Sequence, residues 1–274
     1  MVGTRALILA AALALLMGGC GSEKVTQTPG AEELFAKAKT EYDDGNYLEA
    51  IEDFNHVTLQ YQGSGFASQA QFYLGECRFQ RNEFLLAATE YDILKRNYPA
   101  SPLVPEAQYK LALSYFNLSP RSYLDQKYTK KAIDEFQTFV EYYPANPHAA
   151  DADTKIKELN NRLAKKLYDD AKQYERLDYY TAALIYYNDV IERYHDTEYA
   201  PLAELDKVEL LIGRKRYLEA RTELARFFDR YPQSVLKARA DRLKESLDKE
   251  LPGAHQATGD RGPTRDVSND EARR

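Results

Sequence analysis

The sequence of 274 residues predicts an all-α fold, a solenoid of about five stacked helical hairpins. One pattern recurs five times: an alanine, a large apolar residue four positions later and a tyrosine eleven positions later. These positions share one stripe of a helix, because successive helical residues turn by roughly 100°. Proline follows the tyrosine in three copies and ends the helix. The alanines are Ala50, Ala87, Ala132, Ala183 and Ala220.

The composition is that of a packed, acidic protein, and it excludes two classes of site. Hydrophobic residues make up 44% of the chain and charged residues 29%, which suffices for a core. The net charge of -6 argues against nucleic acid, since phosphates attract a basic face. Two cysteines and four scattered histidines cannot form a Cys/His metal cage. We therefore expect no metal and no cofactor.

The repeating unit has a base length of 37 residues, because the alanines lie 37, 45, 51 and 37 residues apart. Its first copy runs from Ala31 through Ala38 to Gly45-Asn46-Tyr47 and then Ala50. This pattern resembles the tetratricopeptide repeat, which implies paired helices stacked into a curved solenoid with a concave groove. The implied repeats are about residues 31–67, 68–104, 105–148, 149–199 and 200–235, followed by a terminal helix to residue 251.

Two insertions explain the longer spacings. The third unit has eight extra residues at 118–125, between its two helices, and this polar segment predicts a surface loop. The fourth unit has fourteen extra residues, and neither Pro nor Gly occurs between about Ala149 and Arg176. That uninterrupted stretch predicts one long helix, a rod of roughly 40 Å at 1.5 Å per residue.

The N-terminal region has the features of an export signal. The apolar run from Ala6 to Met17 is shorter than the roughly 20 residues that span a bilayer, so residues 1–19 are predicted to be a signal peptide. The run ends in Met-Gly-Gly-Cys20, which resembles the lipobox of bacterial lipoproteins and implies a covalent lipid anchor on Cys20. The next residue, Gly21, differs from the Asp of inner-membrane retention signals, so we expect the outer membrane.

Polar segments flank the predicted solenoid on both sides. Residues 20–30 have no apolar periodicity and are predicted to form a flexible tether. Residues 252–274 combine glycines, prolines and mixed charge, and they are predicted to be a disordered polar tail.

The sequence carries no pattern typical of an enzyme. It has no Gly-rich phosphate loop, no Gly-x-Ser-x-Gly and no His-Glu-x-x-His. Cys77 lies within a repeat helix, and nothing in the sequence places a base beside it. We therefore predict that the protein has no catalytic residue and that Cys77 is a buried, unreactive thiol.

Six aromatic residues form two rows along the first helices of the first three repeats. In the tetratricopeptide fold such positions tend to face the groove, which implies a channel for extended segments with aromatic side chains. The alternative is that the rings belong to the core between repeats, because the second repeat has Gln71 and Arg78 at usual core positions. The six residues are Phe35, Tyr42, Phe72, Phe79, Tyr109 and Phe116.

The repeats, the short tether and the lipobox together resemble one family over about residues 20–235. This is the BamD-type lipoprotein family of the outer-membrane β-barrel assembly machinery. The matching segments are Cys20, Asp44-Gly45-Asn46-Tyr47, Ala50-Ile51, Tyr98-Pro99, Ser101-Pro102, Tyr143-Pro144 and the segment from Leu159 to Lys165.

The resemblance implies a non-catalytic scaffold on the periplasmic face of the outer membrane. Its C-terminal repeats would bind a BamA-type barrel protein, and other assembly lipoproteins could join. Its N-terminal groove would receive unfolded outer-membrane proteins through their aromatic-ended C-terminal segments.

A second family of periplasmic tetratricopeptide proteins is also similar in places. It coordinates envelope constriction and cell-wall synthesis, and the segments from Ser68 to Glu76 and from Tyr98 to Pro102 match it. That family usually lacks the lipid-bearing cysteine and begins with a coiled coil, for which residues 21–30 have no heptad pattern. Coordination of envelope constriction and cell-wall synthesis is therefore the alternative function.

Overall fold

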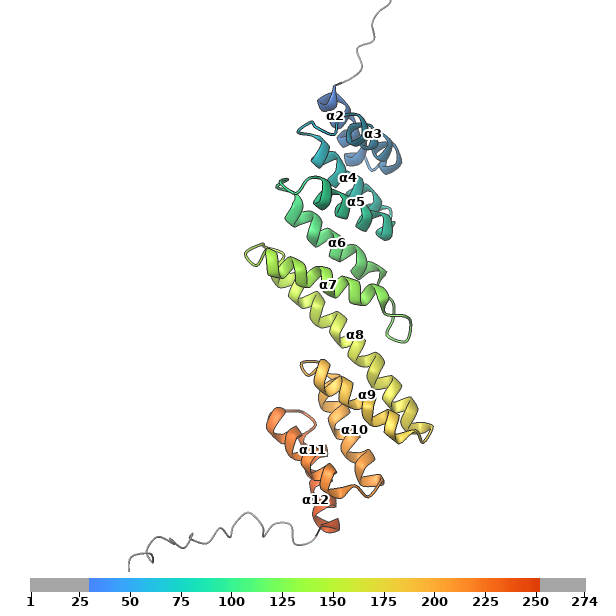
Figure 1. Cartoon of the computed structure of the whole chain (residues 1–274), viewed down its shortest axis with the longest axis vertical. Helices are drawn as coiled ribbons and strands as arrows, with labels where there is room; N and C mark the ends of the chain where they lie inside the picture. Colours follow the sequence, from blue (N-terminus) through green and yellow to red (C-terminus); the bar gives the residue numbers. More distant parts are fainter. Residues whose placement is uncertain (1–29, 252–274) are drawn as a thin grey trace, which may run out of the picture.

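The computed structural model describes residues 30–251, and every regular element in this range is an α-helix. The predicted signal peptide, Cys20, most of the tether and the tail after residue 251 lie outside the described residues. Figure 1 shows the helices stacked in chain order along the long axis. They are α2 (Ala31–Asp43), α3 (Tyr47–Gln60), α4 (Ala67–Gln80), α5 (Phe84–Asn97), α6 (Val104–Leu118), α7 (Lys127–Tyr142), α8 (Ala149–Arg176), α9 (Tyr180–Arg193), α10 (Tyr199–Gly213), α11 (Tyr217–Arg230) and α12 (Lys237–Glu250).

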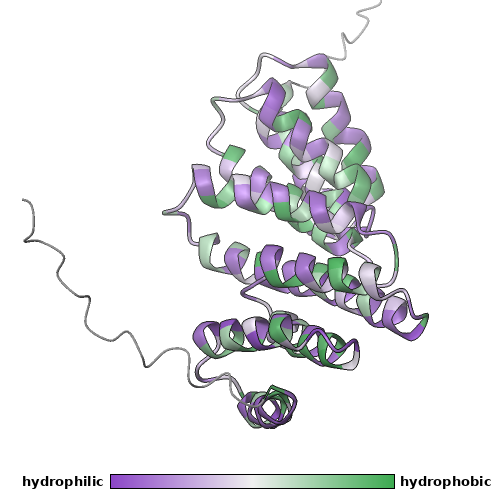
Figure 2. Ribbon diagram, turned by 60° about the horizontal axis from the view of Figure 1, so that its bottom comes forward, coloured by the Kyte–Doolittle hydropathy of each residue, from purple (hydrophilic) through white to green (hydrophobic). Residues whose placement is uncertain are grey.

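Each helix packs against its neighbours in the chain, so the helices form successive hairpins. Every predicted repeat range contains one hairpin, from α2–α3 to α10–α11, and α12 follows the fifth. Hydrophobic and hydrophilic residues alternate along the helices, which lets each contribute an apolar stripe to its neighbours (Figure 2). The predicted all-α, tetratricopeptide-like solenoid is confirmed.

The repeated alanine is the point where the two helices of each hairpin meet. All five alanines are completely buried. The large residue four positions later is buried as well, and in the second and fourth repeats it is a tyrosine, Tyr91 and Tyr187. A methyl side chain allows the helices to approach closely, and the large residue fills the adjacent space. The pattern read from the sequence is therefore the core of each hairpin.

Residues in the left-handed conformation end the first helix in several hairpins. Gly45 has a φ of +82° in the predicted α2–α3 turn, and Asn82, Asp178 and Lys215 have φ values of 59°, 62° and 60° in later turns. Glycine and asparagine adopt this conformation at little cost, whereas a lysine is strained there.

The two predicted insertions lie where the sequence placed them. The helix α8 spans Ala149–Arg176, 28 residues, and is roughly 40 Å long. The loop between α6 and α7 rests on α8, because Arg162 Nη1 donates to Ser119 O at 3.0 Å. Gln126 Nε2 also donates to the carbonyls of Arg121 and Leu124, at 2.8 and 2.9 Å. The loop is thus braced at both ends.

A buried carboxylate joins α8, α10 and α12. Asp206 on α10 is 4% exposed and accepts a hydrogen bond from the Tyr168 hydroxyl on α8 at 2.6 Å. Lys172 Nζ lies 3.4 Å from the same carboxylate, and Arg239 on α12 forms an ion pair with it. These partners offset the cost of burying the charge. The C-terminal repeats are therefore fastened to the long helix.

We predict that Gly75→Ala destabilises the fold. A Cβ at Gly75 would lie 2.5 Å from Cε1 of the buried Tyr91 ring, whose hydroxyl donates to Glu76. Overpacking of this kind costs about 1–3 kcal/mol. Urea unfolding measures the loss. The matched control is Gly213→Ala, where no atom lies within 4 Å, and it should cause no loss of stability. Equal stability of the two variants would contradict the prediction.

Candidate functional site

The six predicted groove aromatics lie on the first helices of three successive hairpins, α2, α4 and α6. Five of them are half-buried, so each retains an accessible part of its ring. The exception is Tyr109, which is 7% exposed. The rows are thus neither an open groove lining nor a closed core.

The aromatics of the first repeat pack around a tyrosine of the second. Tyr73 on α4 lies 5.1 Å from Tyr42 and 6.0 Å from Phe35, measured between ring centroids. It also stacks on the buried Phe54 at 5.5 Å. Sequence reasoning missed Tyr73, because it stands one position after the row residue Phe72. It connects the first two repeats and adds a half-buried ring to the surface.

In the second repeat, the two predicted rings contact the second helix of the same hairpin. Phe72 lies 5.8 Å from Tyr91, and Phe79 lies 5.2 Å from Phe84. Gln71, at a usual core position, is buried and hydrogen-bonded to Glu90 of α5. Because Gln71 is polar, the rings of Phe72 and Phe79 supply the apolar contacts to α5 that an apolar residue at position 71 would make.

Tyr109 differs from the other five because it belongs to a packed interface. Its ring stacks on His148 at 4.3 Å, and its hydroxyl donates to Asp151 of α8 at 2.6 Å. Burial raises the pKa of Tyr109, and the hydrogen bond to Asp151 raises it further. For this residue, the core alternative describes the contacts.

One of the two rows consists of Tyr42, Phe79 and Phe116, and a lysine ammonium lies over each of these three rings. The distances from Nζ to the ring centroid are 5.5 Å for Lys39 and Tyr42, 5.4 Å for Lys110 and Phe79, and 4.6 Å for Lys155 and Phe116. Such cation–π pairs place positive charge beside apolar surface. Each of these lysines also forms an ion pair with a carboxylate of the chain, Asp43, Glu76 or Asp151. We name the half-buried rings and these lysines the N-terminal aromatic surface; its rings suit a segment with aromatic side chains.

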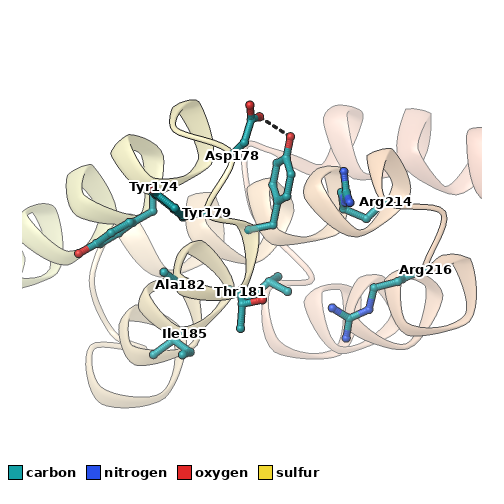
Figure 3. A pocket seen from close by; sticks show the side chains of 10 residues that line it. Tyr174, Asp178, Tyr179, Thr181, Ala182, Ile185, Arg214 and Arg216 are labelled. Atoms are coloured by element: carbon teal, nitrogen blue, oxygen red, sulfur yellow. Dashed lines mark hydrogen bonds between the residues drawn. The ribbon is translucent and has the colours of Figure 1, made fainter.

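A second surface lies in the C-terminal repeats, where a cavity of about 830 Å³ opens between the α8–α9 turn and the α10–α11 turn (Figure 3). Tyr179 is 62% exposed and Ile185 is 57% exposed beside it. Sequence reasoning missed this surface because its two halves lie in separate turns. Its lining includes Tyr174, Tyr179, Tyr180, Ile185, Arg214 and Arg216, and we name it the C-terminal cavity.

Polar contacts hold the rim of the C-terminal cavity in place. The Arg214 guanidinium lies 4.3 Å from the Tyr180 ring centroid, and the Tyr180 hydroxyl donates to Asp178. That hydrogen bond raises the pKa of Tyr180. Arg216 pairs with Glu219. Apolar walls between two arginines suit a protein segment that combines an apolar side chain with an acidic one.

Cys77 is a buried free thiol, as the sequence predicts. Burial raises its pKa from 9.0 to about 12, and the neighbouring Glu76 contributes in the same direction. A thiol in this environment has almost no thiolate at neutral pH, and the thiolate is the nucleophilic form. Among residues 30–251, no cluster of His, Cys, Asp and Glu side chains could hold a metal ion.

Comparison with known proteins gives the family. Residues 28–215 match the family described as outer membrane lipoprotein, YfiO. The match spans more than half of the 274 residues. The chain belongs to this family. The matched range covers the first four predicted repeats and part of the fifth, and it begins after Cys20.

Curated relatives of this chain are named outer membrane protein assembly factor BamD. The protein from Caulobacter vibrioides is 29% identical over 219 residues, covering 77% of this chain and 72% of that protein. The protein from Rickettsia prowazekii is 26% identical over 238 residues, covering 84% of this chain and 93% of that protein. The protein from Neisseria meningitidis serogroup B is 25% identical, covering 78% of this chain and 90% of that protein.

Solved structures with a similar arrangement include the TPR2AB domain of yeast Sti1. It aligns with 80% of this chain and 83% of its own length, at 15% identity and a TM-score of 0.41.

We predict that Cys77 does not react in the folded protein. In a Cys20→Ser variant it is the one remaining thiol, and a rise in pKa from 9.0 to about 12 lowers the thiolate fraction at pH 8 by about 1,000-fold. Ellman's reagent should therefore label the folded variant only after urea is added. Rapid labelling without urea would contradict the buried placement.

Proposed function

We propose that this chain is a non-catalytic lipoprotein scaffold of the outer-membrane β-barrel assembly machinery. The observation that carries the proposal is the match to the outer membrane lipoprotein family over residues 28–215. Relatives named outer membrane protein assembly factor BamD support it, because this chain covers 72% to 93% of the three described above.

The proposed location is the periplasmic face of the outer membrane, with a lipid on Cys20 as the anchor. Within residues 30–251, no helix has the length and apolar character needed to span a bilayer. Several acyl chains on one cysteine hold a protein stably at a membrane, whereas a single chain does so only marginally. The tether over residues 20–30 would separate the anchor from the first repeat.

The N-terminal aromatic surface is the proposed site for unfolded outer-membrane proteins. Its half-buried rings offer apolar area to an extended segment with aromatic side chains. A chain that ends in an aromatic residue carries its terminal carboxylate next to that ring. That carboxylate would compete with Asp43, Glu76 and Asp151 for the lysines, so the proposed recognition rests on the aromatic rings.

The C-terminal cavity is the proposed docking site for a BamA-type barrel protein. Tyr179 and Ile185 are exposed there without a partner in the solenoid to cover them, and Arg214 and Arg216 flank them. Exposed apolar side chains between charged ones are typical of protein interfaces. Other assembly lipoproteins would bind elsewhere on the repeats.

We predict that replacing Phe72 and Phe79 with serine weakens binding of a labelled peptide that ends in an aromatic residue by about tenfold or more. Fluorescence anisotropy measures the affinity, and circular dichroism checks the fold. The control is Tyr142→Ser, an exposed tyrosine on α7 outside the rows. A folded double variant with unchanged affinity would contradict the proposed site, whereas an unfolded one would support the core alternative.

We predict that Ile185→Asp removes the barrel protein from material co-purified with a C-terminally tagged chain. The side chain is 57% exposed, so the substitution alters the surface and leaves the core unchanged. The control is Leu59→Asp on α3, which is also exposed and lies in the first repeat. Recovery of cell-wall synthesis proteins with no barrel protein, already with the unmodified chain, would favour the envelope-constriction alternative.

A further inference from the structure

Two hairpins share a polar connection between their helices. In the second repeat, Gln71 Nε2 donates to the backbone oxygen and to Oε2 of Glu90, at 3.1 and 2.8 Å. In the third repeat, Gln108 Nε2 donates to the same two atoms of Glu135, both at 2.9 Å. Both glutamines are buried. In both hairpins, therefore, the amide of a glutamine on the first helix donates hydrogen bonds to a glutamate on the second helix.

The fifth repeat has the same arrangement with one change. The two glutamates stand three residues after the repeat alanine, and Glu223 occupies that position after Ala220. Gln71 stands sixteen residues before Ala87, and the residue sixteen before Ala220 is Glu204. A carboxyl group therefore stands at the position equivalent to Gln71, and a second one, Glu223, stands at the position equivalent to Glu90.

In the fifth hairpin, the carboxyl group of Glu204 is buried without a hydrogen-bond partner. Its side chain is 0% exposed, and neither carboxyl oxygen has a hydrogen-bond partner. Among residues 30–251, this is the one carboxyl group with both oxygens buried and unsatisfied. An ionised carboxylate in such a place costs several kcal/mol unless a partner compensates it.

Three cations, Arg230, Lys207 and Arg226, lie close enough to favour the ionised form of Glu204, but none donates a hydrogen bond to it. Arg230 Nη1 lies 3.6 Å from Glu204 Oε2, beyond hydrogen-bond distance. Lys207 and Arg226 lie 2.9 Å from Glu223 and are engaged there. Charged groups of α8 and α12 that reach α10, Lys172 and Arg239, bind Asp206 instead. Tyr231 of α11 is the remaining titratable group that interacts with Glu204.

We propose that Glu204 is protonated in the folded chain, and that its hydroxyl takes the place of the glutamine amide as the donor to Glu223. Beside the apolar core and the Lys207–Glu223 ion pair, the α10–α11 hairpin then has a polar connection that depends on one proton, whereas the equivalent connections of the α4–α5 and α6–α7 hairpins use amides that do not titrate. Loss of the proton leaves two facing carboxylates and loosens α10 from α11. The turn that carries Arg214 and Arg216 joins these two helices, so the wall of the C-terminal cavity loosens with them.

The direction of the pH dependence follows from burial, which raises the pKa of Glu204 above its ordinary value of 4.5, with Arg230 opposing the rise. A group with a raised pKa in the folded state contributes stability that is fully present below its unfolded pKa. That stability is lost as the pH rises through the folded pKa. The fifth hairpin should therefore become less stable toward alkaline pH.

Hydrogen exchange on the full-length protein in detergent tests the proposal. Protection of α10–α11 amides, corrected for intrinsic exchange rates, should fall by up to about tenfold per pH unit above the raised pKa. Glu204→Gln should abolish that dependence and increase protection at alkaline pH. Protection of the α4–α5 hairpin serves as the internal reference and should stay constant.

The reciprocal substitution is the matched control. Gln108→Glu places a carboxyl group at the equivalent position of the third repeat, so it should confer pH-dependent protection on α6–α7. Protection of α10–α11 that does not change with pH, or that falls in Glu204→Gln, would overturn the proposal, because Glu204 would then be a stabilising anion. If Glu204→Gln does not fold, infrared spectra of the unmodified protein decide: a carboxylic-acid band at neutral pH supports the proposal, and its absence overturns it.

Discussion

The close approach of two helices at a buried alanine is the constraint on which the rest of the fold depends. All five alanines at that position are completely buried, and their small side chains allow the two helices to approach closely. The next large residue along the same stripe, such as Phe54 or Tyr187, then fills the space beside the contact. Since each hairpin contacts little beyond its neighbours, stability accumulates along the stack and no single central core is required.

This construction leaves some first-helix positions free to serve two purposes. The half-buried rings of the N-terminal aromatic surface contact the adjacent helix with one part and solvent with another. They can be exposed because the alanine and its partner already hold the hairpin together. Where a first helix turns a polar residue inward, as at Gln71 and Gln108, a glutamate on the second helix accepts a hydrogen bond from it. In the fifth repeat, the equivalent positions hold Glu204 and Glu223. The chemistry of that pair can vary from repeat to repeat without altering the backbone.

The sequence allowed the repeats, the α8 helix and the α6–α7 loop to be predicted because each depends on spacing along one chain. Periodicity reports which stripe of a helix is buried. It does not report how far two stripes rotate against each other, and this rotation decides whether Tyr109 lines a groove or stacks on His148. The C-terminal cavity could not be predicted for a related reason. Tyr179 and Arg214 come from separate turns, and only the packing of one hairpin on the next brings them together.

The long helix α8 connects the two proposed binding surfaces. Its first part packs on α7, and its last part contacts α9 and α10, so one continuous backbone connects the N-terminal repeats with the C-terminal ones. Asp206 attaches α10 to α8, and the loop at Ser119 is hydrogen-bonded to α8, so elements from both halves of the stack bind the same helix. A partner held at the C-terminal cavity and a segment held at the aromatic surface would therefore be connected through α8, because the repeats on either side contact this one backbone.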